Sequence, residues 1–312
     1  MKAIIIEKYG GPEVLKMKDV EKPTPKPDEV LIQIKATSVT ASDVLIRSLK
    51  VPFLYKLMVQ LIFGFGRPRN PILGMVASGV VAEKGAAVTK FNVGDGVFAY
   101  CSMPPMKLRF GSYAEYICLP EEWNLALKPT NISFEEAAAI PYGGLLATHL
   151  INKTSIKKGD KVLIYGASGS IGTMAVQLAK IAGATVTSVC SGKNFELVKS
   201  LGSDKVIDYT LPNAESQLET YQYVIDAVGK NKTSPLKVKS KEAINKNGKY
   251  LSIDKGTPQT PKKSFLALKA LVEQGKLKAV IDKVYPLAEV VEAHRYVEIG
   301  HKRGSVILSV HQ

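Results

Sequence analysis

The sequence predicts an α/β protein, in which a barrel-like β-rich part is followed by a doubly wound parallel sheet. Three observations predict this architecture. Short β-branched or aromatic runs bounded by turn residues occupy roughly the first 120 residues. From residue 161 onward, strand and helix patterns alternate, which implies parallel strands joined by helices. A glycine-rich segment at residues 166–172 stands at the first strand–helix junction of that alternating region.

The β-rich part is predicted from short apolar runs and the turns between them. Pro23, Pro25 and Pro27 mark an early loop, and residues 92–96 (Asn-Val-Gly-Asp-Gly) have turn chemistry. Short strands with frequent turns favour a barrel. The strand predictions are residues 30–35, 79–83 and 96–100.

The pattern changes after Trp123. Ser133, with Glu136 three residues later, predicts a capping box that begins an alanine-rich helix. Strands are then predicted at residues 161–165, 185–189, 206–208, 223–227 and 250–253, with helices at 171–182 and 196–201. The C-terminal part predicts helices at 265–274 and 289–297, a further segment at 279–285 and a last strand at 305–310.

Composition and charge exclude several classes of protein. Of 312 residues, 46% are hydrophobic and 22% charged, which excludes a disordered tail and a collagen-like chain. The net charge is +14, and residues 230–283 supply +10 of it through 14 lysines and four acidic residues. The favoured interpretation is a solvated basic face. Attraction of a polyanionic cofactor or of nucleic acid remains an alternative.

The cysteines and the apolar segments bear on location. Cys101, Cys118 and Cys190 are widely spaced and odd in number, which favours a reducing compartment. The most apolar stretch, residues 51–65, contains Lys56 and is shorter than the ~20 residues of a membrane span. We therefore expect a cytoplasmic protein without a transmembrane segment. The same stretch could be a lid over a lipophilic substrate, core, a homodimer contact or a peripheral membrane contact.

The glycine-rich segment predicts a dinucleotide site. A tight turn between a strand and a helix directs backbone N–H groups and the positive end of the helix dipole toward a pyrophosphate. Gly169 would leave room for the phosphates, and Gly172 would let the helix approach closely. The residues of this predicted site are Gly166, Ala167, Ser168, Gly169, Ser170, Ile171 and Gly172.

The end of the next predicted strand indicates which dinucleotide binds. A site for NAD usually places a carboxylate there, about 20 residues after the glycines. Here Cys190 is followed by Ser191 and Lys193, and no acid appears before Glu196. We therefore predict NADP(H), with Ser191 and Lys193 at its 2′-phosphate. Lys193 could instead be a solvated loop lysine, and Tyr209 could either flank the adenosine or serve packing.

Segments along the whole chain resemble the medium-chain dehydrogenase/reductase superfamily, in its zinc-free quinone oxidoreductase (zeta-crystallin-like) branch. Besides the glycine loop, the matching segments are GGPEVL (10–15), PDEVLI (27–32), PILG (71–74), VGDGV (93–97), GSYAEY (111–116), AAAIPYGG (137–144), LGSDKVIDY (201–209) and DAVG (226–229). The resemblance implies a GroES-like catalytic domain, residues 1–123 with 262–312, around a Rossmann domain, residues 124–261. It also implies hydride transfer from NADPH to a quinone or an α,β-unsaturated carbonyl.

The resemblance also implies residue roles. Val228, Gly229, Ile253 and Asp254 would line the nicotinamide. Zinc-dependent relatives place a cysteine near position 40 and a Gly-His-Glu motif at 74–76, where this chain has Thr40 and Gly-Met-Val. With no C-x-x-C and no H-E-x-x-H either, we expect no metal.

The chain departs from the branch at four places. Zinc-free relatives usually keep an acid at position 76, and often an asparagine at 40, a threonine at 146 and a lysine near the last strand. This chain has Val76, Thr40, Leu146 and Ser305. These departures leave the substrate open.

A proton donor is needed where negative charge grows on the substrate oxygen. The candidates are Thr40, Tyr55 and Tyr142. Asp43 is expected to stabilise the β-rich domain, and His149 to be a hydrogen-bonded core residue. Short-chain dehydrogenases share the glycine loop but need Tyr-x-x-x-Lys, which no tyrosine here provides. Two other functions stay open, an enoyl-thioester reductase and an NADPH-sensing or RNA-binding protein with little catalysis.

Overall fold

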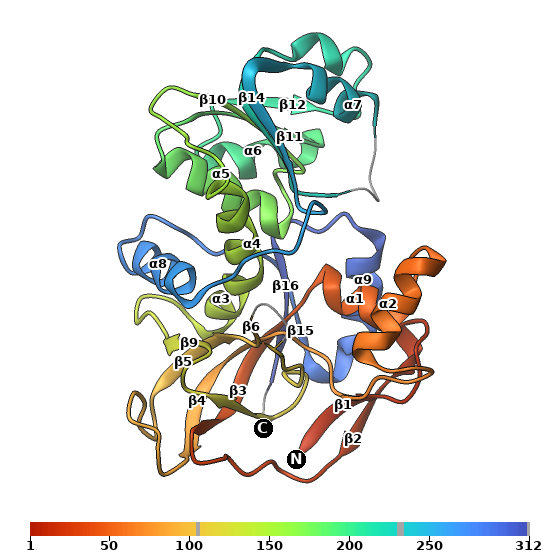
Figure 1. The fold of residues 1–312 in the computed structure, drawn as a ribbon, viewed down its shortest axis with the longest axis vertical. Coiled ribbons are helices and arrows are strands. Elements are labelled where there is room, and N and C mark those ends of the chain that lie inside the picture. Colours follow the sequence, from red (N-terminus) through yellow and green to blue (C-terminus); the bar gives the residue numbers. More distant parts are fainter. Residues whose placement is uncertain (104–106, 230–233, 311–312) are drawn as a thin grey trace. The chain divides into compact units, whose positions relative to one another are not determined.

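The chain folds into two units, each built around its own sheet (Figure 1). The computed structural model describes residues 1–103, 107–229 and 234–310. Unit 1 comprises Met1–Tyr142, Pro261–Lys269 and Ile281–Gln312, and unit 2 comprises Gly143–Thr260 and Ala270–Val280. Sequence reasoning placed the functional domain limits at 123/124 and 261/262, and those limits remain a prediction.

The main sheet of unit 1 is centred on the long strand β3 (Glu29–Val39), which pairs with three neighbours. Val30, Leu31 and Ile32 are all fully buried, so β3 is covered on both faces. A separate hairpin joins β1 (Lys2–Ile6) to β2 (Leu15–Asp19). The other strands of the main sheet are β4 (Val76–Lys84), β5 (Gly96–Tyr100), β8 (Tyr116–Pro120), β9 (Asn124–Leu127), β15 (Ile281–Pro286) and β16 (Ser305–Ser309).

Helices of unit 1 begin where the sequence supplies a cap. The capping box predicted at Ser133 and Glu136 is confirmed and begins α3 (Phe134–Ala139), which packs on β3, β4 and β16. A second capping box, from Thr40 to Asp43, begins α1 (Ala41–Ser48). The others are α2 (Phe53–Phe63), α9 (Val290–Ile299) and the first part of α8 (Lys262–Glu273).

Unit 2 holds a parallel five-stranded sheet in the order β12-β11-β10-β13-β14. Counted along the chain this order is 3-2-1-4-5, which is that of a doubly wound Rossmann sheet. The predicted fold class is therefore confirmed. The strands are β10 (Lys161–Tyr165), β11 (Thr185–Cys190), β12 (Lys205–Asp208), β13 (Tyr221–Asp226) and β14 (Ile244–Ser252).

Helices α5 (Ser170–Ile181), α6 (Phe195–Ser200) and α7 (Pro235–Glu242) lie between successive strands of unit 2. Helix α4 (Pro141–Ile151), most of which belongs to unit 2, precedes β10. Strand order reverses between β10 and β13, and in such sheets ligands bind at this switch point, beyond the carboxyl ends of the strands. Within residues 1–103, 107–229 and 234–310, every helix is too short or too polar to cross a membrane.

Candidate functional site

The glycine loop lies at the switch point, between β10 and α5. Gly166 and Ala167 donate their N–H groups to Val189 O of β11, at 3.0 Å each, which ties the loop to the neighbouring strand. Gly169 is the N-cap residue of α5 and supplies no side-chain acceptor to the first turn. The N–H groups of a first turn have no partner within their helix, so this end of α5 is suited to an anion.

Two glycines of this loop are required by close approach of the chain to itself. A Cβ on Gly172 would lie 2.1 Å from Gly166 O. Gly166 has φ of +80°, and a Cβ there would lie 2.3 Å from Val228 Cγ1. A Cβ on Gly169 would meet Gly166 O only at 3.6 Å, so the space beside Gly169 is open.

Asn194 joins the glycine loop to the end of β11. Its Nδ2 donates to Ser168 Oγ (3.0 Å) and to Ser191 Oγ (3.2 Å), and its side chain is buried. The structure thus brings together two of the residues that the sequence analysis singled out, through a third that it missed. Lys193, by contrast, is exposed.

A carboxylate that sequence reasoning missed lies close to Ser191. Asp208, at the end of β12, accepts a hydrogen bond from Gly192 N–H at 2.7 Å and two from Thr210. Burial raises the pKa of Asp208, but these hydrogen bonds outweigh burial and hold the pKa below its ordinary value. Its neighbour Tyr209 is 37% exposed, and its ring centroid lies 6.4 Å from that of Tyr165.

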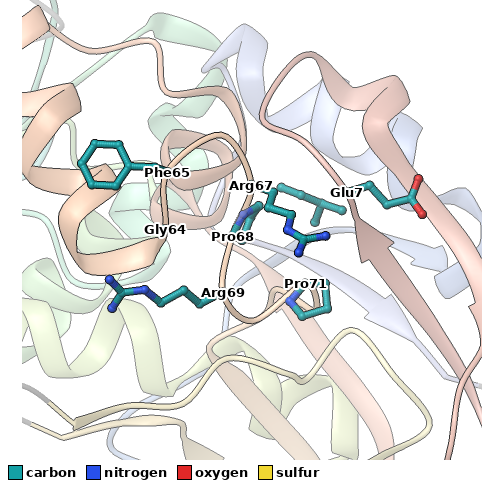
Figure 2. Close-up of a pocket in the computed structure, with 8 residues that line it drawn as sticks. Glu7, Gly64, Phe65, Arg67, Pro68, Arg69 and Pro71 are labelled. Atoms are coloured by element: carbon teal, nitrogen blue, oxygen red, sulfur yellow. The ribbon is translucent and has the colours of Figure 1, made fainter.

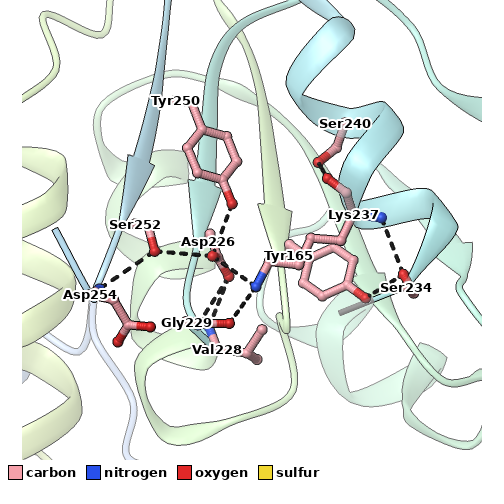
Figure 3. A network of polar contacts seen from close by, with 10 residues as sticks. All are labelled: Tyr165, Asp226, Val228, Gly229, Ser234, Lys237, Ser240, Tyr250, Ser252 and Asp254. Carbon is pink, nitrogen blue, oxygen red and sulfur yellow. Dashed lines mark hydrogen bonds and ion pairs between the residues drawn. The ribbon is translucent and has the colours of Figure 1, made fainter. Parts of the chain in front are cut away.

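Asp226, at the carboxyl end of β13, organises the other side of the switch point (Figure 3). One carboxylate oxygen accepts from the N–H groups of Val228 and Gly229, at 3.2 Å each. The other accepts from Tyr250 Oη (2.9 Å) and Ser252 Oγ (3.0 Å) on β14. Burial, and then the negative charge of Asp226, raises the pKa of Tyr250.

Lys237 of α7 completes this cluster and corrects one expectation. Its Nζ lies 2.9 Å from Asp226 Oδ2 and also donates to Gly229 O, and only 6% of the residue is exposed. The lysine-rich segment is therefore not uniformly a solvated face. A buried lysine needs such a partner because an unpaired buried charge is very costly.

The residues expected to line the nicotinamide gather at this end of β13 and β14. A Cβ on Gly229 (φ +70°) would lie 2.3 Å from the carboxylate of Asp254. Ile253 donates its N–H to Asp226 O at 3.1 Å. Because Val228 also contacts Gly166, these residues adjoin the glycine loop.

The structure describes the side chains of two of the three candidate proton donors, Thr40 and Tyr142. Thr40 Oγ1 donates to Asp43 Oδ2 (2.6 Å) and accepts from Asp43 N–H, so its proton is used within the capping box of α1. Thr40 could act as a proton donor to a substrate only if its bond to Asp43 broke. Tyr142 is half-buried, and its Oη lies 3.1 Å from Ser42 Oγ. The side chain of Tyr55 lies outside the described part of the structure.

Asp43 is a structural residue of unit 1. It is fully buried and also accepts from Gly74 N–H at 3.2 Å. Burial raises the pKa of Asp43 to about 6, although hydrogen bonds from Thr40, Gly74 and Tyr113 oppose the increase. Its bonds to Thr40 and Gly74 fit the structural role predicted for Asp43, which stays a prediction. In unit 2, His149 is likewise a bonded core histidine, since its Nδ1 accepts from Gln259 N–H at 2.9 Å.

Comparison with known proteins assigns the chain to a family. Residues 26–130 match the alcohol dehydrogenase GroES-like domain, and residues 248–308 match a model described as zinc-binding dehydrogenase. The chloroplastic NADPH-dependent alkenal/one oxidoreductase of Arabidopsis thaliana is 32% identical, over 99% of this chain and 79% of its own length. The chain belongs to the medium-chain dehydrogenase/reductase superfamily, in its quinone oxidoreductase branch.

Two further comparisons cover whole chains. The chloroplast envelope quinone oxidoreductase homolog of Arabidopsis thaliana is 31% identical, over 99% of this chain and 98% of its own length. The structure of the quinone oxidoreductase from Coxiella burnetii superposes with a TM-score of 0.85 at 28% identity, over 100% and 99% of the two chains. The chain is accordingly an oxidoreductase.

The position of the zinc ligands in zinc-dependent members of this superfamily is occupied by other residues here. Thr40 Oγ1 lies 4.0 Å from Met75 Sδ, and Val76 belongs to the fully buried core of β4. Among the residues that the structure describes, no three His, Cys, Asp or Glu side chains form a group able to hold a metal ion. Independence of zinc remains a prediction for this oxidoreductase.

Proposed function

We propose that this oxidoreductase transfers a hydride from NADPH to a quinone or an α,β-unsaturated carbonyl, without zinc. The main observation that supports this proposal is the position of the glycine loop, residues 166–172, at the switch point of a Rossmann sheet. Relatives named as alkenal/one and quinone oxidoreductases support the substrate class.

The residues of unit 2 fit the dinucleotide. The uncapped start of α5 and the open space beside Gly169 suit a pyrophosphate, which Gly166, Ala167, Ser168, Gly169, Ser170, Ile171 and Gly172 would hold. Val228, Gly229, Ile253 and Asp254 would hold the nicotinamide end. When bound, NADPH supplies the hydride from C4 of its nicotinamide.

Ser191 and Lys193 would recognise the 2′-phosphate. The Ser191 hydroxyl is positioned by Asn194, and the exposed ammonium of Lys193 can swing toward a phosphate. Asp208 places a negative charge beside them, which would oppose the phosphate. We propose that its hydrogen bonds from Gly192 and Thr210 satisfy that carboxylate, so that it fixes the turn rather than the ribose. Tyr209 would flank the adenosine.

Because NADPH supplies the hydride, the protein has two tasks. It orients the substrate, and it supplies a proton to the substrate oxygen as that oxygen becomes anionic. We propose a tyrosine hydroxyl for this step, Tyr142 or Tyr55. The Oη of Tyr142 already lies within hydrogen-bonding reach of Ser42, which would orient its proton.

Two broader assignments are also proposals. The functional domains would be residues 1–123 with 262–312, and 124–261, because this division keeps the β-rich segments together. The location would be cytoplasmic, because Cys101, Cys118 and Cys190 are all free and buried, which suits a reducing compartment.

The test is a titration of the purified protein with NADPH and, separately, with NADH, followed by nicotinamide fluorescence. Quinones, enals and an enoyl thioester are then added, and NADPH oxidation is measured. Tight binding of NADPH with turnover of quinones or enals supports the proposal. Faster turnover of the thioester would make the chain an enoyl-thioester reductase, and binding of neither nucleotide would overturn the assignment of the glycine loop.

A further inference from the structure

Helix α2 and the loop after it carry a surface that the proposed function does not use. We call it the α2 patch, and it consists of Phe53, Lys56, Met58, Leu61, Ile62, Phe65, Arg67 and Arg69. Its apolar members are unusually exposed: Phe53 by 76%, Leu61 by 60% and Phe65 by 59%. Exposed apolar side chains gathered in one place usually mark an interaction site.

The helix is fixed to unit 1 by its opposite side. Val59 is buried, and the ring of Phe63 packs edge-on against Phe110 with centroids 5.3 Å apart. Met58, Leu61 and Ile62 follow the i, i+3, i+4 spacing of one helix face, and all three are exposed. The packing of Val59 and Phe63 therefore keeps Met58, Leu61 and Ile62 exposed on the surface.

The charged side chains of the α2 patch itself are all positive. Residues 44–82 contain no aspartate or glutamate, and Arg67 and Arg69 are exposed. Among the described residues, no carboxylate lies within ion-pairing distance of either arginine. Glu7, which lines a neighbouring hollow together with Arg67 and Arg69, is paired with Lys18.

A hollow of about 660 Å³ adjoins the patch and shows how the arginines are directed (Figure 2). Its lining residues are Ile6, Glu7, Gly64, Phe65, Arg67, Pro68, Arg69 and Pro71. Arg67 and Arg69 point to opposite sides of the loop, and Phe65 lies on the same side as Arg69. The two guanidinium groups do not converge on one small anion, so a broad anionic surface fits them better.

We propose that the α2 patch docks on an anionic lipid bilayer. Apolar side chains would enter the boundary between headgroups and acyl chains, and Arg67 and Arg69 would contact the headgroups. A second copy of the chain is a less suitable partner for the α2 patch than an anionic bilayer is. A two-fold interface through the patch would bring the arginines of two copies together, and Glu7 at the edge of the patch is already paired with Lys18.

The experiment is flotation of the full-length protein with two kinds of vesicle. One is phosphatidylcholine alone, and the other contains about 30 mol % phosphatidylserine, enough to give a negative surface potential. We expect binding to the second kind only, and weaker binding as salt is raised. The double variant Arg67→Gln/Arg69→Gln is expected to bind about 25-fold more weakly, at about fivefold for each cation.

Matched variants separate the patch from general surface effects. Leu61→Ser/Ile62→Ser should lose binding, whereas Val93→Ser/Ile299→Ser, which removes equally exposed apolar side chains elsewhere, should not. Lys276→Gln/Lys278→Gln makes the same change of charge on other exposed residues and should also leave binding intact. Circular dichroism confirms that each variant is folded.

Three results would overturn the proposal. The first is an absence of binding to the anionic vesicles by the wild-type chain. The second is an equal loss of binding in the Lys276 and Lys278 variant, which would mean that net charge alone decides. The third is a combination of two results. Sedimentation velocity shows that the wild-type chain is a dimer and that Leu61→Ser/Ile62→Ser is a monomer, and the wild-type chain does not bind the vesicles. All three measurements are independent of NADPH and of turnover.

Discussion

Lys237 Nζ lies 2.9 Å from Asp226 Oδ2, and both side chains are almost completely buried. The pair sits between α7 and the carboxyl ends of β13 and β14, and it holds the backbone of Gly229 from both sides. The proposed nicotinamide-lining turn therefore depends on an ion pair in the interior of unit 2.

Replacing Lys237 should show how much this ion pair contributes to the stability of unit 2. Lys237→Met leaves Asp226 buried without its cation, and we expect a loss of about 3–5 kcal/mol in the free energy of unfolding. Urea denaturation measures it, and Lys239→Met, an exposed lysine two residues away, is the control. Adding Asp226→Asn to Lys237→Met should restore part of the loss. An equal effect of both single lysine variants would contradict this account.

Asn194 gives a second prediction, on cofactor affinity. Asn194→Ala removes the bonds to Ser168 and Ser191, and we expect NADPH to bind about tenfold more weakly, since each bond contributes roughly 1 kcal/mol. Nicotinamide fluorescence measures the dissociation constant. Asn152→Ala, at an exposed position, should bind as wild type does. Unchanged affinity in Asn194→Ala would mean that the junction of loop and strand does not hold the cofactor.

Lys193 gives a prediction on the choice between the two nucleotides. Lys193→Gln removes a charge-assisted contact to the 2′-phosphate, worth roughly 1.5–3 kcal/mol, so NADPH affinity should fall by about tenfold or more. NADH lacks that phosphate, and its affinity should not change. Lys199→Gln, in the following helix, is the control. A parallel loss for both nucleotides would assign Lys193 a general electrostatic effect.

Asp43 gives a prediction on pH. Its pKa is 3.8 for a free side chain and about 6 in the folded chain, so the folded state binds the proton more tightly. Stability from this group is present below about pH 4 and is lost as pH rises through about 6. The loss is at most about 3 kcal/mol.

The measurement compares wild type with Asp43→Asn by urea denaturation at several pH values between 4 and 7. Groups that are remote from Asp43 are expected to titrate alike in both proteins and so to cancel in the difference. The stability advantage of wild type over the variant should shrink as pH rises across this window. A difference that stays constant, or that grows with pH, would refute the raised pKa.

Much of the fold followed from local pattern. The alternation after residue 161 and the glycine loop predicted the parallel sheet, because strand and helix periods and turn residues are local properties. The capping box at Thr40 and Asp43 is also visible in the sequence, as Thr-x-x-Asp, but this pattern alone does not show that the hydroxyl proton of Thr40 is donated to Asp43. Its proton proved to be used by its own helix.

The remaining features depend on which strands are neighbours. Asp208 reaches Gly192 because β12 pairs with β11 with Cys190 opposite Asp208, and no spacing along the chain reveals this. Lys237 looked like one more solvated lysine because its partner lies 11 positions earlier, on another element. Asn194 likewise gained its role only when the loop and the strand end met.

Five donor groups contact the carboxylate of Asp226, and together they restrain three segments of unit 2. They come from the turn after β13, from β14 and from α7, so none of these three can open without breaking bonds to the same carboxylate. Amide hydrogen exchange at Val228 and Gly229 should therefore be slow for a loop and should share one opening free energy with Ser252. The turn beside the proposed nicotinamide site would then be rigid before any cofactor arrives, with little entropy left to lose on binding.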